Sequence, residues 1–529
     1  NMREVKEDMS EREKLALSHP VSVMLDKEPA DFKRQDFLRL IESKQLERIS
    51  FHYLGLDGKM RELKIPVSGR YQVETILAEG ERVDGSSIYK GLVDMGLSDL
   101  YVVPVYKSAF FNPFDDRSLD FVCRYFDAQG RPAPFTLDNI LAQAHRLFRK
   151  NSGLELRALG ELEFFLIGNF EPKLYLPEKK RSYQAMSPFI KSGQILDEMM
   201  RYVTQITGAV KYAHTEAGYV DSVRSDFEEI DGKQAEQLEI EFLPRPIEDM
   251  ADYLVLARWL IRNVAYKYGL IATFTPKIEE GVAGSGLHFH LEMTKDGKNI
   301  MVEQNGQLSQ EARRLIGGLC YYADSLTAFG NTVSSSYLRL VPNLEAPTRI
   351  CWSDLNRSAL IRVPLGWTGV ENLARLINPS DQTDFTRPES RQTVELRSPD
   401  GSALIHLLLA GMAMAADWAF RPEQTISGEN QPLELARKLY VKGNIFEDRE
   451  LLESLPRLPG SCVESARILR DKRELYERDG AFPPSIIDYT VRMLEAEDDE
   501  FMAKKLADLP ADERLREIRK IMHKDLHKH

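Results

Sequence analysis

The chain has 529 residues, enough for more than one domain, and 43% of them are hydrophobic, which is typical of a globular protein. Its formal net charge of -12 argues against non-specific nucleic-acid binding, which requires a positively charged surface. The sequence has no run that approaches the roughly 18 apolar residues of a membrane span, so no membrane segment is expected.

The cysteines and the first residues indicate the compartment. Cys123, Cys320, Cys351 and Cys462 form no CxxC pair, so the sequence predicts neither a zinc ribbon nor a disulfide framework. Residues 1–8 are largely charged and lack the apolar core of a signal sequence. A reducing cytoplasm is therefore the expected location.

The N-terminal part predicts a polar extension followed by a small β-rich unit. Residues 1–30 are polar and either helical or loose, and residues 31–130 form the β-rich unit. Within it, Gly55–Gly58 has the composition of a turn between two strands. The predicted strands are Ile49–Tyr53, Arg61–Pro66, Leu100–Pro104 and Leu119–Tyr125.

The rest of the chain, residues 131–529, predicts strands that alternate with longer helices. Thr136–Asp138 has the composition of a helix start. Residues 465–529 are charge-rich and predicted to be helical. The other predicted helices are Ile195–Thr207, Met250–Tyr268, Leu315–Phe329 and Ala403–Ala419.

Four short apolar runs carry polar residues two positions apart. Side chains alternate faces along a strand, so the two members of each pair point to the same side. One such strand is usually just half solvated. Four of them in one sheet would instead form a polar wall suited to divalent cations and phosphates, because buried charges need partners or a metal. The pairs are Glu161 with Glu163, Glu239 with Glu241, His288 with His290, and Glu395 with Arg397.

Several segments, taken in order, resemble motifs of the glutamine synthetase family, in particular its bacterial type I members. A single such motif would be weak, whereas the ordered set is specific. The segments are Arg82–Ile88, Gly160–Phe165, Gly284–His290, Arg339–Pro342 with Glu345–Pro347, Asn356–Arg362 and Val394–Asp400.

The resemblance implies an α+β fold and a ring. A small N-terminal β-grasp domain would precede a catalytic domain built on an open antiparallel β-barrel flanked by helices. Family members form homo-oligomeric hexameric rings, usually stacked into dodecamers. Each active site lies between subunits, because the N-terminal domain of one completes the site of the next.

The implied reaction is the ATP-dependent synthesis of glutamine from glutamate and ammonia, through a γ-glutamyl phosphate. Phosphoryl transfer depends mostly on positioning and charge neutralisation. Mg²⁺ or Mn²⁺ suits oxygen ligands, and Mn²⁺ tolerates imidazole. The resemblance assigns Glu161, His288 and Glu395 to a nucleotide-side metal, and Glu163, Glu216 and Glu239 to a substrate-side metal.

Further residues match positions around the substrates. Arg339 matches the residue that clamps the α-carboxylate of glutamate, and His290 matches the one that contacts substrate or phosphate. Gly284 begins the signature loop at the substrate. Asp84 matches the residue that binds ammonium and takes its proton, although an ordinary Asp-Gly turn is a competing interpretation. Glu345 matches the flap residue that closes over the intermediate.

Four arginines are expected to carry the phosphate chemistry. Arg357, Arg362 and Arg397 match arginines that neutralise phosphate charge, for which a planar guanidinium is suited. We assign Arg357 to catalysis, Arg362 to the nucleotide and Arg397 to the substrate. Arg391 stands near the place of an expected lysine and is assigned to the nucleotide.

The sequence also departs from the family pattern around these pockets. Ala283 replaces an asparagine beside the glutamate pocket, and Glu292 replaces a serine. Pro244 lies where an aromatic residue usually stacks on adenine. The insertion after Glu216 is longer than usual, which leaves Glu228 and Glu229 as alternative ligands.

Three functions remain open at this stage. The first is glutamine synthesis, which the retained Asp84 favours. The second is a γ-glutamyl ligase that uses an amine instead of ammonia, which Ala283 leaves open. The third is a non-catalytic relative that serves as a ring-forming scaffold, against which the complete set of acids, histidines and arginines argues.

Overall fold

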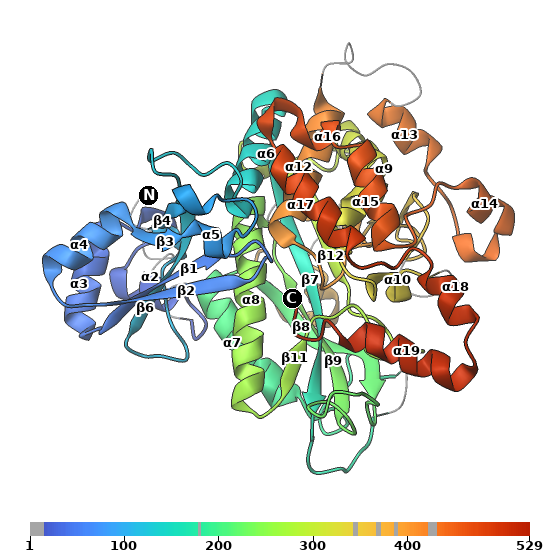
Figure 1. Ribbon diagram of the computed structural model, residues 1–529, viewed down its shortest axis with the longest axis horizontal. Coiled ribbons are helices and arrows are strands. Elements are labelled where there is room, and N and C mark those ends of the chain that lie inside the picture. The colour runs from blue at the N-terminus through green and yellow to red at the C-terminus, as the bar shows by residue number, and fades with distance from the viewer. Residues whose placement is uncertain (1–14, 178–180, 342–346, 367–371, 386–389, 422–430) are drawn as a thin grey trace.

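The computed structural model describes residues 15–177, 181–341, 347–366, 372–385, 390–421 and 431–529. It contains two β-sheets, each with its own helices. The N-terminal unit lies beside the long helix α8 (Ile247–Lys267), and the C-terminal helices lie on the opposite side of the larger sheet (Figure 1). The expected α+β class is confirmed.

The N-terminal sheet has six strands in the order β2-β1-β6-β4-β3, with β5 also on β6. β1 and β6 are parallel and the other pairs are antiparallel. The strands are β1 (Arg48–Leu54), β2 (Met60–Pro66), β3 (Glu81–Asp84), β4 (Asp99–Pro104), β5 (Phe110–Phe111) and β6 (Ser118–Phe126). The helices are α2 (Pro20–Leu25), α3 (Arg34–Lys44), α4 (Arg70–Glu79) and α5 (Gly85–Ile88).

The larger sheet has ten strands, of which seven follow the order β14-β15-β16-β12-β7-β9-β8. β10 and β11 also pair with β7, and β13 pairs with β12. Only β14 and β15 pair in parallel among these strands. The strands are β7 (Glu155–Gly168), β8 (Val210–Val220), β9 (Gln234–Phe242), β10 (Arg245–Pro246), β11 (Ile271–Thr273), β12 (Leu287–Lys295), β13 (Lys298–Asn299), β14 (Trp352–Asp354), β15 (Ile361–Val363) and β16 (Val394–Leu396).

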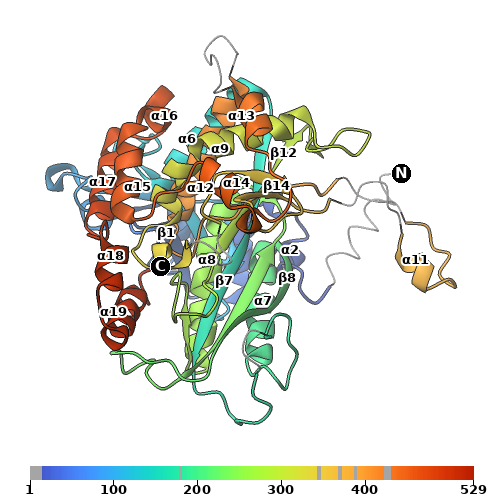
Figure 2. The ribbon, with the colours of Figure 1, turned by 90° about the vertical axis from the view of Figure 1, so that its right-hand side faces the viewer.

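Helices flank the larger sheet (Figure 2). The apolar α12 is buried along almost its whole length and packs against α6 and α9. A Cβ atom on Gly318 would lie 2.4 Å from the carbonyl oxygen of Ala415, so this glycine permits the close approach of α9 and α12. The helices are α6 (Leu137–Ser152), α7 (Gly193–Thr207), α8 (Ile247–Lys267), α9 (Gln310–Gly330), α10 (Ser336–Arg339), α11 (Ala374–Ile377), α12 (Ile405–Phe420), α13 (Pro432–Lys438), α14 (Arg449–Ser454), α15 (Cys462–Asp471), α16 (Glu474–Glu477), α17 (Pro484–Glu495), α18 (Met502–Ala507) and α19 (Ala511–His523).

The two faces of the larger sheet differ in character. Leu162, Ile240, Phe289 and Leu396 are fully buried on one face, which packs against α8 and the rest of the core. A Cβ atom on Gly160 of β7 would lie 2.9 Å from Leu254 of α8, which shows how closely this helix covers the strand. The opposite face carries the polar partners of these residues.

The hairpin between β8 and β9 packs against the segment that follows α19. Leu526 belongs to a small apolar cluster with Val220, Val223 and Ile230 of the hairpin. Thr273 Oγ1 donates a hydrogen bond to the carbonyl of Leu526 over 2.7 Å. The C-terminal segment therefore packs against the β8–β9 hairpin and against β11.

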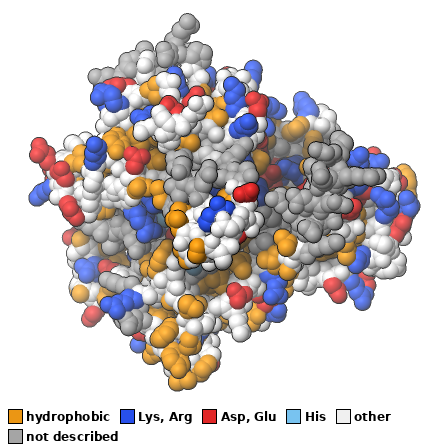
Figure 3. All heavy atoms as spheres, turned by 180° about the vertical axis from the view of Figure 1, so that it is seen from behind, with side chains coloured by type: hydrophobic (Ala, Val, Ile, Leu, Met, Phe, Trp, Pro, Cys, Tyr) orange, Lys and Arg blue, Asp and Glu red, His pale blue; other side chains and the backbone are white. Residues whose placement is uncertain are grey.

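The described residues between β7 and α7, 169–177 and 181–192, expose several large apolar side chains. Leu174, Tyr175, Met186 and Phe189 are each more than half exposed. Hydrophobic side chains gather at the lower end of the molecule, where this loop lies (Figure 3). Among the described residues, no helix combines the length and the apolar character needed to cross a membrane.

Candidate metal and nucleotide site

The strand register brings the predicted polar pairs onto one face of the larger sheet. Glu161 lies opposite His288 on one side and Glu241 on the other. Glu163 lies opposite Glu239, and His290 lies opposite Glu395. Because residues directly opposite one another share a face, these side chains form the wall that the sequence predicted.

The first cluster on this wall joins Glu161, His288 and Glu395, whose donor atoms all lie within 4.8 Å of one another. Nδ1 of His288 lies 2.8 Å from Glu161 and 3.6 Å from Glu395. Nε2 of His290 lies 2.8 Å from the other oxygen of Glu161. Burial alone would raise the pKa of Glu161, but the His290 charge and hydrogen bonds from both histidines hold it well below its usual value.

A second cluster joins His214, Glu216 and Glu239 within the same 4.8 Å limit. Nε2 of His214 lies 3.5 Å from Glu239, and Nδ1 lies 3.9 Å from Glu216. Burial alone would lower the pKa of His214, but hydrogen bonding to Glu239 and the nearby carboxylates raise it. The insertion after Glu216 therefore leaves this residue beside Glu239 in space.

Glu163 lies between the clusters and the signature loop. The backbone N–H of Gly286 donates to Glu163 over 2.7 Å, and Gln237 donates to the same oxygen over 3.3 Å. Burial raises the pKa of Glu163 to about 7. Burial also raises the pKa of Glu239, and the neighbouring carboxylates raise it further. The hydrogen bond from His214 acts in the opposite direction but is outweighed. Close, buried carboxylates with raised pKa values fit a site that binds cations.

Three arginines border the wall. Nη1 of Arg362 lies 3.0 Å from Glu395, and Nε of Arg397 lies 3.1 Å from the same carboxylate. The sequence predicted Arg397 within the strand, whereas β16 ends one residue earlier, at Leu396. The Arg397 side chain nevertheless lies on the same side as Glu395 and contacts it. Arg339 donates to the Ser398 carbonyl over 2.9 Å, and its Nη2 lies 3.4 Å from Nε2 of His288. Their positive charge therefore lies beside the first cluster.

Among the contacts between described residues, no side-chain hydrogen bond or ion pair joins Arg357, Arg391 or Asp84 to the wall. Arg357 is exposed, although its carbonyl accepts a hydrogen bond from Arg397. Arg391 is exposed before β16. Asp84 belongs to the N-terminal unit, where it accepts hydrogen bonds from Ser86 and Ser87 at the start of α5. Glu345 lies outside the described residues.

The signature loop places Gly284 beside Arg339. A Cβ atom on Gly284 would lie 3.0 Å from Cγ of Arg339. The Gly284 carbonyl accepts a hydrogen bond from Gln237 over 3.0 Å. Gln237 therefore connects this loop to Glu163, a role that the sequence reasoning missed.

His214 and Tyr183 were also missed. His214 is two residues from Glu216 on β8, so the pattern that identified the other four pairs would have found it. Tyr183, from the loop of residues 169–192, lies edge-on to His214 with 5.3 Å between ring centroids. Burial and the charge of Glu216 raise the pKa of Tyr183, but the sequence around Tyr183 carries no signal of this contact.

Other carboxylates near the site, or considered as alternative ligands, are paired with basic residues or exposed. Glu241 pairs with Lys211 over 2.6 Å, although it also lies within 4.8 Å of Glu161 and Glu239 on the wall. Glu292, which replaces the expected serine, pairs with Arg157 over 3.0 Å. Glu228 and Glu229 are exposed, and Glu229 lies 2.6 Å from His527.

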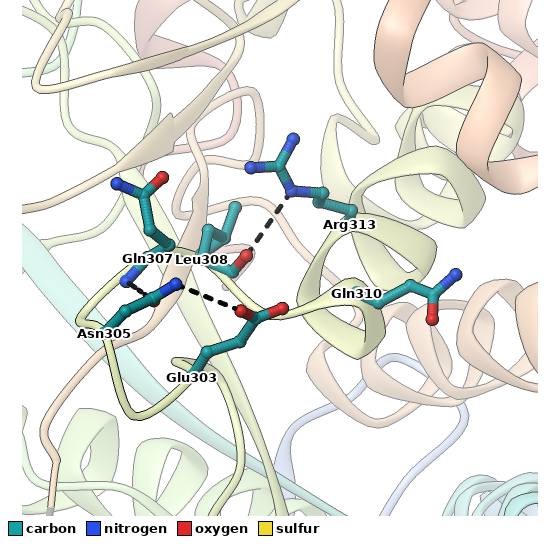
Figure 4. Close-up of a pocket in the computed structure, with 6 residues that line it drawn as sticks. All are labelled: Glu303, Asn305, Gln307, Leu308, Gln310 and Arg313. Carbon is teal, nitrogen blue, oxygen red and sulfur yellow. Dashed lines mark hydrogen bonds between the residues drawn. The ribbon is translucent and has the colours of Figure 1, made fainter.

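The surface of the larger domain has two hollows to consider. One, of about 650 Å³, is lined by His214, Tyr212, Met186, Ile190 and Leu196 among others, and so adjoins the second cluster. The other, of about 420 Å³, lies at the start of α9 and is lined by polar side chains such as Glu303, Asn305 and Arg313 (Figure 4). None of the predicted site residues lines this second hollow.

Comparison with known families tests the resemblance. A model of the glutamine synthetase β-grasp domain matches residues 45–128, and a model of the glutamine synthetase catalytic domain matches residues 139–508. The chain belongs to the glutamine synthetase family. The β-grasp domain expected at the N-terminus is thereby confirmed.

Curated members of the glutamine synthetase family are distant but extensive matches. Glutamine synthetase of Sulfolobus acidocaldarius is 27% identical over 468 residues, covering 83% of this chain and 89% of that protein. Glutamine synthetase of Thermus thermophilus is 29% identical over 450 residues, covering 83% and 90%.

Solved structures share the fold. A glutamine synthetase of Plasmodium falciparum has a TM-score of 0.69 at 18% identity, covering 91% of this chain and 98% of that one. A GmaS protein without ligand has a TM-score of 0.68 at 20% identity, again covering 91% and 98%. ATP and divalent metals are expected for this family, and the acidic clusters agree with that expectation.

Proposed function

We propose that this chain is an ATP-dependent ligase that forms glutamine from glutamate and ammonia through a γ-glutamyl phosphate. The observation that carries the proposal is the polar wall, on which two carboxylate–imidazole clusters lie and Arg339, Arg362 and Arg397 border the first of them. Cations and guanidinium groups on one surface suit phosphoryl transfer, which needs charge neutralisation and alignment.

The donor set fits Mg²⁺ or Mn²⁺, because it consists of carboxylate oxygens with one imidazole in each cluster. We assign Glu161, His288 and Glu395 to the nucleotide-side ion. Glu163, Glu216 and Glu239 would hold the substrate-side ion, with His214 as an additional donor. When bound, these ions would neutralise the charge on the transferred phosphoryl group.

The arginines fit ATP and glutamate in different ways. Nε of Arg362 is buried and has no hydrogen-bond partner among the described residues, so a phosphate oxygen could satisfy it. Arg397, buried beside Glu395, would align the phosphoryl group together with Arg357, and Arg391 would reach the nucleotide. Arg339, beside Gly284 and the first cluster, would clamp the α-carboxylate of glutamate.

The remaining roles involve a neighbouring subunit and the flap. Asp84 would bind ammonium and take its proton in the site of the next subunit of a hexameric ring, which we expect to stack into a dodecamer. Glu345 would close over the intermediate and exclude water. The four cysteines are buried and none is disulfide-bonded, which supports a cytoplasmic location.

A second candidate is a γ-glutamyl ligase that accepts an amine. The hollow of about 650 Å³ beside His214 favours it, because ammonia needs no such space. Its lining by Met186, Ile190, Leu196 and Tyr212 would suit an amine with an apolar body.

The test supplies purified protein with ATP, Mg²⁺ or Mn²⁺, glutamate, and either ammonia or a panel of amines. Phosphate release with ammonia, and glutamine detected by mass spectrometry, would support the proposal. Release only with an amine would support the second candidate. Glu161→Gln should abolish turnover, and Glu303→Gln, a carboxylate variant in the hollow of Figure 4, is its matched control and should not. Normal Mn²⁺ binding without turnover of any acceptor would favour a non-catalytic ring scaffold.

A further inference from the structure

The loop of residues 276–285 leads into the signature segment and closes on itself. The backbone N–H of Ser285 donates to the carbonyl of Pro276 over 3.0 Å, so the two ends of the loop are joined. One end places Gly284 beside Arg339. The far side of the loop contacts α19. The 276–285 loop therefore lies between the polar wall and the C-terminal helix.

His523, the last residue of α19, makes the central contact with this loop. It is 1% exposed, and its Nε2 lies 2.8 Å from the carbonyl oxygen of Ile278. A carbonyl can only accept, so Nε2 carries the proton that it donates. Nδ1 lies 2.9 Å from the hydroxyl of Ser225, which accepts from the backbone of Phe227 and can donate its own proton to the ring. Burial lowers the pKa of His523, which favours this neutral form.

Arg519 adds a second contact, one turn earlier on α19. Its Nε lies 3.2 Å from one oxygen of Glu279, and its Nη2 lies 3.2 Å from the other. A guanidinium that binds both oxygens fixes the orientation of a carboxylate. Ile278, next to Glu279, is fully buried in the apolar cluster that contains Leu526. The far side of the loop is thus held through its backbone and through a side chain.

The two ring nitrogens of His523 serve different segments. Nδ1 contacts Ser225, which belongs to the hairpin between β8 and β9, in the insertion that follows Glu216. His527 adds an ion pair of 2.6 Å with Glu229 of the same hairpin. Nε2 contacts the 276–285 loop instead. The support of the loop can therefore be separated from the support of the hairpin.

The loop connects this contact to two groups of the candidate site. A Cβ atom on Gly284 would lie 2.6 Å from the carbonyl oxygen of Pro276 and 3.0 Å from Cγ of Arg339, so the loop packs directly against this arginine. Gly286, just after the loop, donates its N–H to Glu163 over 2.7 Å. A displacement of the loop would therefore displace the groups assigned to glutamate and to the substrate-side ion.

We propose that His523 is a positioning residue for glutamate binding, which acts through the hydrogen bond from its Nε2 to the carbonyl of Ile278. The inference rests on the proposed function, because it takes Arg339 as the clamp of the α-carboxylate. Arg519 contributes less, because its side chain is 29% exposed and solvent weakens its ion pair. The hydrogen bond between Nδ1 and Ser225 orients the ring but does not reach the loop.

Two amide substitutions in the full chain separate the ring nitrogens. A glutamine amide extends as far as Nε2 and keeps a donor for Ile278, whereas an asparagine amide extends only as far as Nδ1 and keeps an acceptor for Ser225. His523→Asn should raise the KM for glutamate about tenfold and change the KM for ATP by less than about twofold, because only the glutamate side is displaced. His523→Gln and Ser225→Ala should leave both KM values near those of the wild type.

Hydrogen exchange gives a second readout that does not need turnover. Exchange in residues 277–286 should be faster in His523→Asn than in the wild type, and unchanged in His523→Gln. Arg519→Met loosens the same loop without altering His523, so it should speed this exchange and raise the KM for glutamate about threefold. Arg516→Met, at an exposed position of the same helix, is the matched control and should change neither quantity.

The comparison between the variants decides the role of His523. A histidine that only stabilises the fold would lower the melting temperature in both amide variants without a selective change in the KM for glutamate. That result, or an equal rise of the KM for glutamate and for ATP, would overturn the proposal. If His523→Asn does not fold, unchanged exchange and KM in Arg519→Met overturn it. If the wild type turns over no acceptor, the proposed function fails, and equal exchange in the two amide variants then overturns the role of His523 separately.

Discussion

Replacing Gly286 by alanine should disable the metal wall without removing any polar group. The added Cβ would lie 2.8 Å from Nε2 of His288 and 2.9 Å from Nη2 of Arg339. Moving these atoms out to an ordinary contact of 3.4 Å requires about half an ångström. Protein metal sites tolerate about 0.2 Å in ligand distance, so His288 would leave its position as a ligand.

The magnitude follows from this displacement. Misplacing a site by about 1 Å can cost about 100-fold in rate, so we expect kcat/KM to fall by about 30- to 100-fold, or about 2 to 3 kcal/mol. Mn²⁺ affinity should fall by about tenfold or more. The clash involves the ends of two side chains, so the melting temperature should change by only a few degrees, about 1 kcal/mol in stability.

The assay combines calorimetric Mn²⁺ titration with steady-state phosphate release. Gly69→Ala is the matched control, because a Cβ there would meet nothing within 4 Å and its φ of -176° is ordinary extended backbone. If Gly286→Ala kept both wild-type Mn²⁺ affinity and wild-type kcat/KM, the assignment of His288 as a ligand would be refuted.

Three further predictions concern charge. Glu161→Ala should abolish both Mn²⁺ binding and turnover, and unchanged affinity in a calorimetric titration would contradict the ligand assignment. Burial raises the pKa of Glu163 to about 7 and also raises that of Glu239, so both carboxyls retain protons in the metal-free protein. Metal binding should therefore release protons, and Mn²⁺ affinity should rise between about pH 6 and 8; calorimetry in buffers of different ionisation enthalpy would show this, and a pH-independent affinity would exclude it. Glu497 is partly buried, which alone would raise its pKa, but hydrogen bonds from Lys524 and Ser334 lower it to about 2. This stabilisation is present above pH 4.5 and is lost as the pH falls toward 2, so Glu497→Gln should lose about 2 kcal/mol at pH 7, less than the full shift implies because Lys524 is 40% exposed. Hydrogen exchange in α19 should show a difference from the wild type that narrows from pH 5 to pH 3, and a constant difference would argue against this pairing.

The sequence predicted the wall because the pattern that indicates it lies within each single strand. Polar residues at i and i+2 within apolar runs determine which side chains share a face of each strand, whatever the strand pairs with. The alternation also explains why the intervening apolar residues, such as Leu162 and Ile240, lie on the other face, where both are fully buried. The long apolar helices were found for a similar reason, and α12 begins at Ile405, two residues after the predicted start.

What the sequence could not supply was information about contacts between distant segments. The sequence does not show which strands are neighbours or in which register they pair. The separation of the carboxylates into two clusters could therefore be predicted only from the family resemblance. His214 was within reach of the pattern, whereas Tyr183 enters the site from a loop without periodicity.

The polar wall also constrains how the chain can reach its native state. Its strands are drawn from positions between Glu155 at the start of β7 and Leu396 at the end of β16, so the wall cannot assemble until the chain has been synthesised through residue 396. Pairings over such separations close slowly, because the loop entropy is lost before the contacts form. Assembly of the wall also brings buried carboxylates close to one another. A divalent cation present during folding would remove that repulsion, so refolding should be faster in Mn²⁺ than in a chelator, and the site would then guide its own assembly.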